Sequence, residues 1–254
     1  MDIVARRFTW QYALSQLKLK YRYTSLGFFW NFLEPALYLG VLSLVFSVVN
    51  KMDIGDYAVF LFGALLPWRY FEKVVNTCMD SIVGGDWLLK KMYVSPFSLP
   101  LARWVVATFE LFFSLTVMFL FLAGLKHPWT IHLIILPLAI IPWSMLGLGV
   151  GLISAVLFTF FRDVRTIIQL VLMLLFFSSP ILFKADLFEG STLQAMMVKL
   201  HPITYFAALF QKPIYQAVWP SPTDWAVSFS VGIVMLVLGV STMNKYKNEF
   251  YYHL

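Results

Sequence analysis

The sequence predicts an all-α integral membrane protein with one N-terminal interfacial helix, six transmembrane helices and short external re-entrant helices between the fifth and sixth spans. Two observations indicate this class. Hydrophobic residues make up 60% of the 254 residues and charged residues only 13%, whereas about a quarter of a soluble protein is charged. The apolar residues also gather in runs of roughly 20, the length of helix that crosses hydrocarbon about 30 Å thick. We expect a single transmembrane domain over residues 1–254.

The N-terminal segment 2–23 is expected to form the interfacial helix. Trp10, Leu14 and Leu17 recur at helical spacing, but basic residues between them leave the segment too polar to span a membrane. No secretory signal is expected, because no apolar region follows the first arginines. We therefore place a cytoplasmic interfacial helix within residues 1–28.

Six apolar runs are long enough to be transmembrane spans. They lie at 29–50, 57–83, 101–125, 133–160, 164–183 and 224–244. An even number of spans puts both termini on one side, and that side carries most of the 19 lysines and arginines. Because positive residues gather on the cytoplasmic side, we expect both termini in the cytoplasm.

Two connections between spans differ from the others. The cytoplasmic segment 84–100 contains a basic and aromatic run that we expect to form a helix stopped by Pro96 and Pro100. The external segment 184–223 holds two apolar patches, 193–200 and 203–210, which are too short to span. Short apolar segments at membrane depth are usually re-entrant or interfacial. The first segment is a candidate docking element and the second a candidate external gate.

The second span carries polar residues on one helical face. These are Arg69, Glu72, Lys73, Asn76 and Asp80. Charged groups within a membrane are costly and must face the bundle interior, a subunit contact or water. One interpretation is a water-filled channel or gate. The other is that these groups pair with one another or with Glu34 and Glu110 and only satisfy the bundle.

Aromatic and small residues allow both functional and packing interpretations. The chain has 25 Phe, 12 Tyr and 9 Trp, whose flat faces could support a sliding sugar chain, but we expect most of them to face lipid or the membrane interface. Gly147 and Gly151 form a small-xxx-small pair that favours close helix approach. Cys78 lies in an apolar run and is interpreted as a small packing residue.

Several catalytic patterns are absent from the sequence. It contains no phosphate-binding loop, no His/Cys cluster with metal-ligand spacing and no Ser/His/Asp arrangement in a polar context. We therefore expect no catalytic residue, no metal and no bound cofactor. If the chain transports a substrate actively, the ATPase is another polypeptide.

Motifs along nearly the whole chain resemble those of the permease subunits of type-2 ABC exporters. This family moves lipid-linked polysaccharides such as O antigen, teichoic acid and capsule. The motifs are Lys20, Tyr21, Thr24, Leu26, Gly27 and Trp30 followed by Pro35, then residues 62–71, 89–93, 99–101, 161–165 and 179–181. Together these motifs are specific, although each alone is weak.

The resemblance implies a homodimer in the inner membrane with two copies of a separate ATPase, which would hold ATP and Mg²⁺. It also implies a channel between the two permeases for a lipid-linked polysaccharide, most closely O antigen, and no nucleic-acid partner. The residues implied in contact with the ATPase are Trp87, Lys90, Lys91 and Tyr93. The candidates to line the channel or gate are Trp30, Tyr38, Arg69, Glu72, Lys73 and Asn76.

Under the same hypothesis, Arg69 and Lys73 meet an anionic pyrophosphate linker or a polar lumen, and residues 190–220 gate the outer mouth. A lumen with charge of one sign would concentrate the opposite sign.

Other functions remain open on the sequence. The chain could export teichoic acid, capsule, small lipids or drugs by the same architecture. A membrane-embedded transferase would need polar catalytic groups at the surface, where Asp163 beside Arg162 and Arg165 is the one candidate and a salt-bridged loop is the favoured explanation. A scaffold protein is disfavoured by the charges in the second span.

Overall fold

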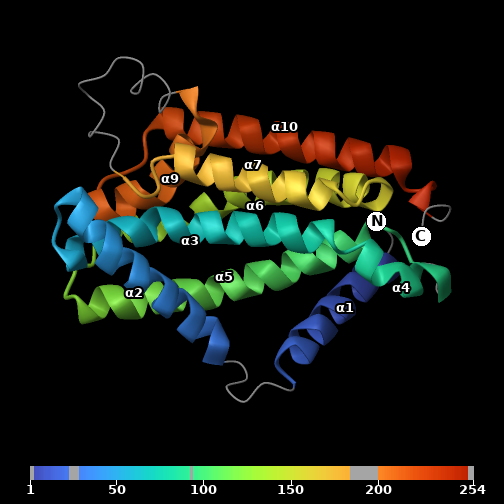
Figure 1. Ribbon diagram of the computed structural model, residues 1–254, viewed down its shortest axis with the longest axis horizontal. Helices are drawn as coiled ribbons and strands as arrows, with labels where there is room; N and C mark the ends of the chain where they lie inside the picture. Colours follow the sequence, from blue (N-terminus) through green and yellow to red (C-terminus); the bar gives the residue numbers. More distant parts are fainter. Residues whose placement is uncertain (1–2, 23–28, 92–93, 184–199, 251–254) are drawn as a thin grey trace.

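The computed structural model describes residues 3–22, 29–91, 94–183 and 200–250, and every regular element in these ranges is a helix (Figure 1). The long helices are α1 (Ile3–Tyr21), α2 (Trp30–Asn50), α3 (Ile54–Met79), α5 (Ser98–Gly124), α6 (Leu136–Phe160), α7 (Val164–Ser178) and α10 (Pro222–Tyr246). The shorter helices are α4 (Asp86–Lys91) and α9 (Pro202–Gln211). The all-α prediction is confirmed for this part of the chain.

Four helical segments are long and apolar enough to cross a membrane. They are Phe32–Asn50, Ser98–Gly124, Ile131–Phe160 and Pro222–Tyr246, which correspond to the first, third, fourth and sixth predicted spans. The second predicted span, α3, has 26 residues, but charged side chains interrupt its apolar run. These findings support a multi-pass membrane protein, and the count of six spans stays a prediction.

The fifth predicted span is shorter than expected. We predicted 164–183, but α7 ends at Ser178 after 15 residues. Ser179 is extended and Pro180 follows it. Proline disfavours helical backbone in the residue before it, which explains the early end.

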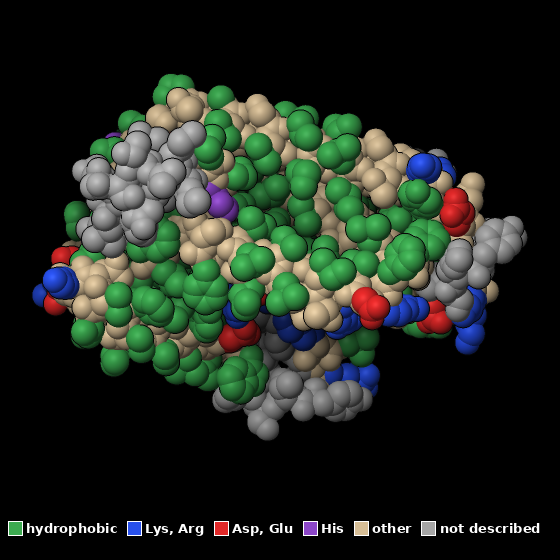
Figure 2. All heavy atoms as spheres, turned by 45° about the horizontal axis from the view of Figure 1, so that its top comes forward, with side chains coloured by type: hydrophobic (Ala, Val, Ile, Leu, Met, Phe, Trp, Pro, Cys, Tyr) green, Lys and Arg blue, Asp and Glu red, His purple; other side chains and the backbone are tan. Residues whose placement is uncertain are grey.

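The molecular surface agrees with a membrane setting. On the face shown in Figure 2, hydrophobic side chains cover the middle of the molecule, whereas charged side chains gather towards its two ends and along one edge. The exposed apolar side chains include Leu170 and Leu174 of α7 and Val234 and Val237 of α10. Such a surface can face lipid, because the backbone N–H and C=O groups of each helix are hydrogen-bonded within the helix.

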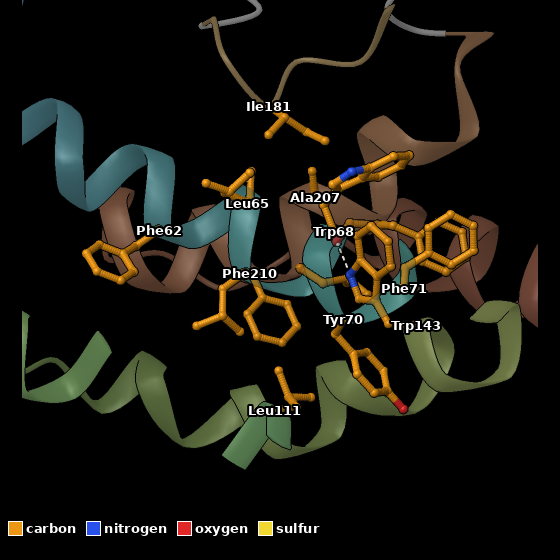
Figure 3. Close-up of a cluster of buried hydrophobic side chains, with 14 of the residues drawn as sticks. Phe62, Leu65, Trp68, Tyr70, Phe71, Leu111, Trp143, Ile181, Ala207 and Phe210 are labelled. Carbon is orange, nitrogen blue, oxygen red and sulfur yellow. Dashed lines mark hydrogen bonds between the residues drawn. The ribbon is translucent and has the colours of Figure 1, made fainter. Parts of the chain in front are cut away.

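The core of the bundle is aromatic and centres on α3, which packs against α2, α5, α6 and α9. Phe71 of α3 lies 5.9 Å from the ring of Trp143, which makes an edge-on contact with Phe206 of α9 at 5.2 Å (Figure 3). The indole N–H of Trp143 donates a hydrogen bond to the carbonyl oxygen of Phe206 at 3.0 Å. Our prediction that aromatic rings would mostly face lipid or the interface missed this buried cluster.

Glycines let α6 approach two helices closely. A Cβ added at Gly151 would lie 2.8 Å from Cβ of Cys78 on α3, and Gly147 faces the same helix. On the other side of α6, a Cβ at Gly149 would lie 2.4 Å from the carbonyl carbon of Met235 on α10. The close-approach prediction for Gly147 and Gly151 is confirmed, and Cys78 is the buried packing residue that we expected.

The segment 84–100, which we expected on the cytoplasmic side, is organised differently from our prediction. It contains α4, but α5 already begins at Ser98, so Pro100 lies in the first turn of a helix instead of ending one. Proline is tolerated there because the first N–H groups of a helix lack intrahelical partners. Leu88 and Leu89 of α4 are buried and fix this short helix to the bundle.

The apolar patch 203–210, which we expected on the external side, forms α9, whose Phe206 and Phe210 are fully buried. Residues 184–199, with most of the other apolar patch, lie outside the described ranges. The re-entrant character of the segment therefore stays a prediction.

Candidate functional site: a charged cavity beside α3

The polar face of α3 lines a cavity of about 300 Å³ between α2, α3 and α5. Five of the six candidate channel residues contribute to its wall: Tyr38, Arg69, Glu72, Lys73 and Asn76. The sixth, Trp30, begins α2 and is not part of this wall. The helical spacing of the polar residues in α3 therefore correctly predicted that they lie on one face of the helix.

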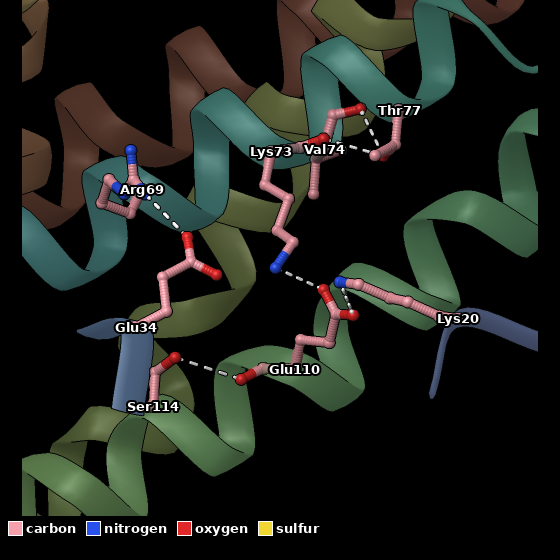
Figure 4. A network of polar contacts seen from close by, with 8 residues as sticks. All are labelled: Lys20, Glu34, Arg69, Lys73, Val74, Thr77, Glu110 and Ser114. Carbon is pink, nitrogen blue, oxygen red and sulfur yellow. Dashed lines mark hydrogen bonds and ion pairs between the residues drawn. The ribbon is translucent and has the colours of Figure 1, made fainter. Parts of the chain in front are cut away.

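Arg69 is held by carboxylates and by an aromatic ring. One guanidinium nitrogen, Nη2, lies 3.1 Å from Oε1 of Glu34 on α2, and Nη1 lies 3.7 Å from Oε2 of Glu72 (Figure 4 shows the pair with Glu34). The guanidinium carbon is 4.6 Å from the centre of the Tyr38 ring. These contacts join α2 to α3 across the cavity.

Glu110 of α5 is the buried acid of the site, with a side chain that is 4% exposed. It forms an ion pair with Lys73 of α3. It also accepts a hydrogen bond from Nζ of Lys20 on α1, at 2.5 Å. The interpretation that the α3 charges pair with Glu34 and Glu110 is confirmed. The participation of Lys20 was not predicted, and no pattern in the sequence indicated it.

The cavity contains charges of both signs. Three carboxylates, those of Glu34, Glu72 and Glu110, face two cations, Arg69 and Lys73. This cavity therefore does not carry charge of one sign. The expected lumen between two permeases stays a prediction. Since opposite charges lie within a few ångströms of one another, the wall is better suited to neutral polar groups than to attracting an anion.

The C-terminal end of α3 is joined to α7 by an ion pair. Asp80, the C-terminal cap of α3, forms an ion pair with Arg165. The Arg165 guanidinium carbon also lies 5.0 Å from the centre of the Phe158 ring. We expected a salt-bridged loop where Asp163 lies beside Arg162 and Arg165, but the guanidinium of Arg165 pairs with Asp80 at the end of α3 instead.

The candidate coupling residues lie on a projecting surface. Trp87 is 54% exposed, and Lys90 and Lys91 are exposed beside it. Lys90 forms a salt bridge with Asp86 one turn earlier, at 3.2 Å. Tyr93 lies outside the described residues. The structure thus presents three of the four candidates together on α4.

Within the described ranges, no group of three or more His, Cys, Asp or Glu side chains is arranged to hold a metal ion. The observed features are long apolar helices, a charge-paired cavity beside the central helix and the short helix α4 with exposed basic and aromatic side chains. These features are typical of a membrane permease.

The chain is similar in sequence to known permeases. No family model matches the chain. The chain is 28% identical to the O-antigen export system permease protein RfbA of Myxococcus xanthus, over 92% of its own length and 90% of that protein. It is 26% identical to the protein of the same name from Klebsiella pneumoniae over the same shares. The polysialic acid transport protein KpsM of Escherichia coli is 25% identical over 67% of each chain.

These relatives confirm the resemblance to the permeases of type-2 ABC exporters. The similarity covers the cavity-lining helices, because it extends over nearly the whole chain.

Proposed function

We propose that this chain is the membrane permease of an ATP-driven exporter of lipid-linked polysaccharide, with O antigen as the substrate class. The observation that carries the proposal is the similarity to O-antigen export permeases over 92% of the chain. The polar cavity among otherwise apolar helices supports it, because a sugar chain needs hydrogen-bonding groups along its route.

The wall of the cavity suits a neutral polymer. Its cations are already paired with carboxylates, so sugar hydroxyl groups can donate to Glu34 and Glu72 or accept from Arg69 without displacing a full charge. The ring of Tyr38 adds a flat amphipathic face to the same wall. We assign this cavity to the wall of the export channel.

The ATPase is assigned to a separate subunit that docks on α4. This helix exposes Trp87, Lys90 and Lys91 and is anchored to the bundle by the buried Leu88 and Leu89. A movement of the ATPase against the exposed side chains would therefore be transmitted to the transmembrane helices. In the active exporter two copies of this chain and two ATPase subunits assemble in the inner membrane, with both termini of the permease in the cytoplasm.

Deletion of the coding sequence in its native host tests the proposed substrate. We expect polysaccharide to disappear from the cell surface and lipid-linked polymer to accumulate on the cytoplasmic side, with restoration by the intact chain. Normal surface polysaccharide in the deletion strain would contradict the proposal.

A second candidate substrate is a capsular polysaccharide, favoured by the similarity to a polysialic acid transport protein. The same deletion strain distinguishes the two candidates. Loss of capsule with intact O antigen would favour the capsule assignment.

A further inference from the structure

The carboxylate of Glu110 is contacted from two different helices. Lys20 approaches from α1 and Lys73 from α3, and Figure 4 shows the two ammonium groups reaching the carboxylate from separate directions. The side chains of Lys20 and Lys73 are 44% and 36% exposed, whereas that of Glu110 is 4% exposed. A single buried acid thus joins the N-terminal helix to the central helix.

Glu110 also lies between two cavities. The second cavity, about 430 Å³, lies under α1 and is lined by Lys20 and Arg103 among others. Four residues, Lys73, Thr77, Ala107 and Glu110, belong to the walls of both cavities. The Lys73–Glu110 pair therefore forms part of the partition between the space under α1 and the proposed channel wall.

We propose that Glu110 is a positioning residue that links α1 to the channel wall, docking α1 through Lys20 and holding the Lys73 amine in the partition. This inference rests on the proposed function for its role in transport, but the linkage itself is a property of the bundle. It predicts two arrangements of the same acid. With α1 docked, the carboxylate is shared by two lysines; with α1 displaced, it stays paired with Lys73.

The presence of two partners makes such a movement feasible. Removing the last partner of a buried charge is strongly unfavourable, because the charge is left uncompensated away from water. Displacement of α1 removes Lys20 but leaves Lys73, so the buried carboxylate keeps a cation throughout. Glu34 and Glu72 contact Arg69 in the same cavity and are far more exposed, at 59% and 36%.

The test measures the two contacts separately in the full-length chain reconstituted in lipid nanodiscs. Amide hydrogen exchange of α1 peptides reports docking, and modification of Lys73 by an amine-reactive reagent, quantified by mass spectrometry, reports the partition. The variants are Lys20→Met and Glu110→Gln. Glu72→Gln is the matched control, because Glu72 lines the first cavity but forms its ion pair with Arg69 instead of with Lys20 or Lys73.

Lys20→Met is expected to speed α1 exchange about tenfold, since a hydrogen bond to a charged group contributes about one power of ten to a local opening equilibrium. It should leave Lys73 modification unchanged. Glu110→Gln is expected to speed α1 exchange and also to raise Lys73 modification several-fold, because the amine is no longer held against α5. Glu72→Gln should change neither.

Unchanged α1 exchange in Lys20→Met would overturn the proposal, and this variant keeps the test decisive even if Glu110→Gln fails to fold, because Lys20 lies at the exposed end of α1. Polysaccharide exported per ATP is then measured for Lys20→Met. A reduced ratio supports the role in transport. If the exchange results hold but the wild-type chain exports nothing, the linkage stands and the proposed function fails.

Discussion

At the scale of single residues, buried acids in this bundle are met by lysines from other elements. Glu110 is shared by Lys20 and Lys73, as described above. Asp224 near the start of α10 is likewise buried and accepts a hydrogen bond from Nζ of Lys212 at 2.5 Å. Because the cost of burying an ionised carboxylate is recovered only through such contacts, these acids are sensitive points for stability.

Replacing Asp224 with Asn is expected to destabilise the protein by about 2 kcal/mol. The carboxylate also accepts from the backbone N–H of Ser221 at 2.7 Å, within a capping box, so the change weakens both an ion pair and a helix start. Thermal unfolding in detergent measures the effect. The control is Asp56→Asn, an exposed acid in the first turn of α3, and equal unfolding temperatures for the two variants would contradict this prediction.

At the scale of helices, the closest packing is between α6 and α10. A Cβ at Gly239 of α10 would lie 2.4 Å from the carbonyl oxygen of Gly149 on α6, and Gly232 of α10 faces α6 in the same way. Backbone atoms, not flexible side-chain ends, occupy these positions at Gly149 and Gly239. The two helices can therefore accept a methyl group at either position only by moving apart.

Gly149→Ala is expected to lower the free energy of unfolding by about 2 kcal/mol through this overpacking. Gly40→Ala is the matched control, because Gly40 also lies within a helix but has nothing within 4 Å of an added Cβ. It should be neutral or slightly stabilising, since alanine favours a helix interior over glycine. Thermal unfolding of the two variants checks the prediction, which fails if Gly149→Ala is as stable as wild type.

The short helix α4 gives an element-scale prediction about coupling. Reversing both charges with Lys90→Glu and Lys91→Glu should abolish association with the ATPase subunit and reduce polysaccharide export. Folding should be preserved, because both lysines are exposed and the ion pair of Lys90 with Asp86 lies at the surface. Export and co-purification are measured together. Lys51→Glu, at the end of α2, is the control, and undiminished export by the double variant would remove α4 from the interface.

At the scale of the whole molecule, hydropathy predicted the long apolar helices well. The expected spans 29–50 and 224–244 differ from α2 and α10 by no more than two residues at either end. The fifth span was predicted too long for a local reason. Apolar residues continue in the sequence past Ser178, whereas the helix ends there, before Ser179 and Pro180.

The candidate site was predicted in part. Pairing of the α3 charges with Glu34 and Glu110 could be anticipated, since charges at membrane depth require partners. The contribution of Lys20 could not, because it depends on how α1 packs on α5, which spacing within one helix does not encode. The burial of Trp143 and Phe206 has the same explanation, since aromatic rings suit both a lipid-facing surface and a protein interior.

The central claim, that this chain is the permease of a polysaccharide exporter, is tested most directly by purifying the tagged chain from native membranes under mild detergent. ATP hydrolysis is then measured with and without lipid-linked polysaccharide. We predict a stable partner subunit with nucleotide-binding motifs and a turnover rate that changes when the polysaccharide is added. A chain that purifies alone, or an ATPase activity that is indifferent to the polysaccharide, would contradict the account.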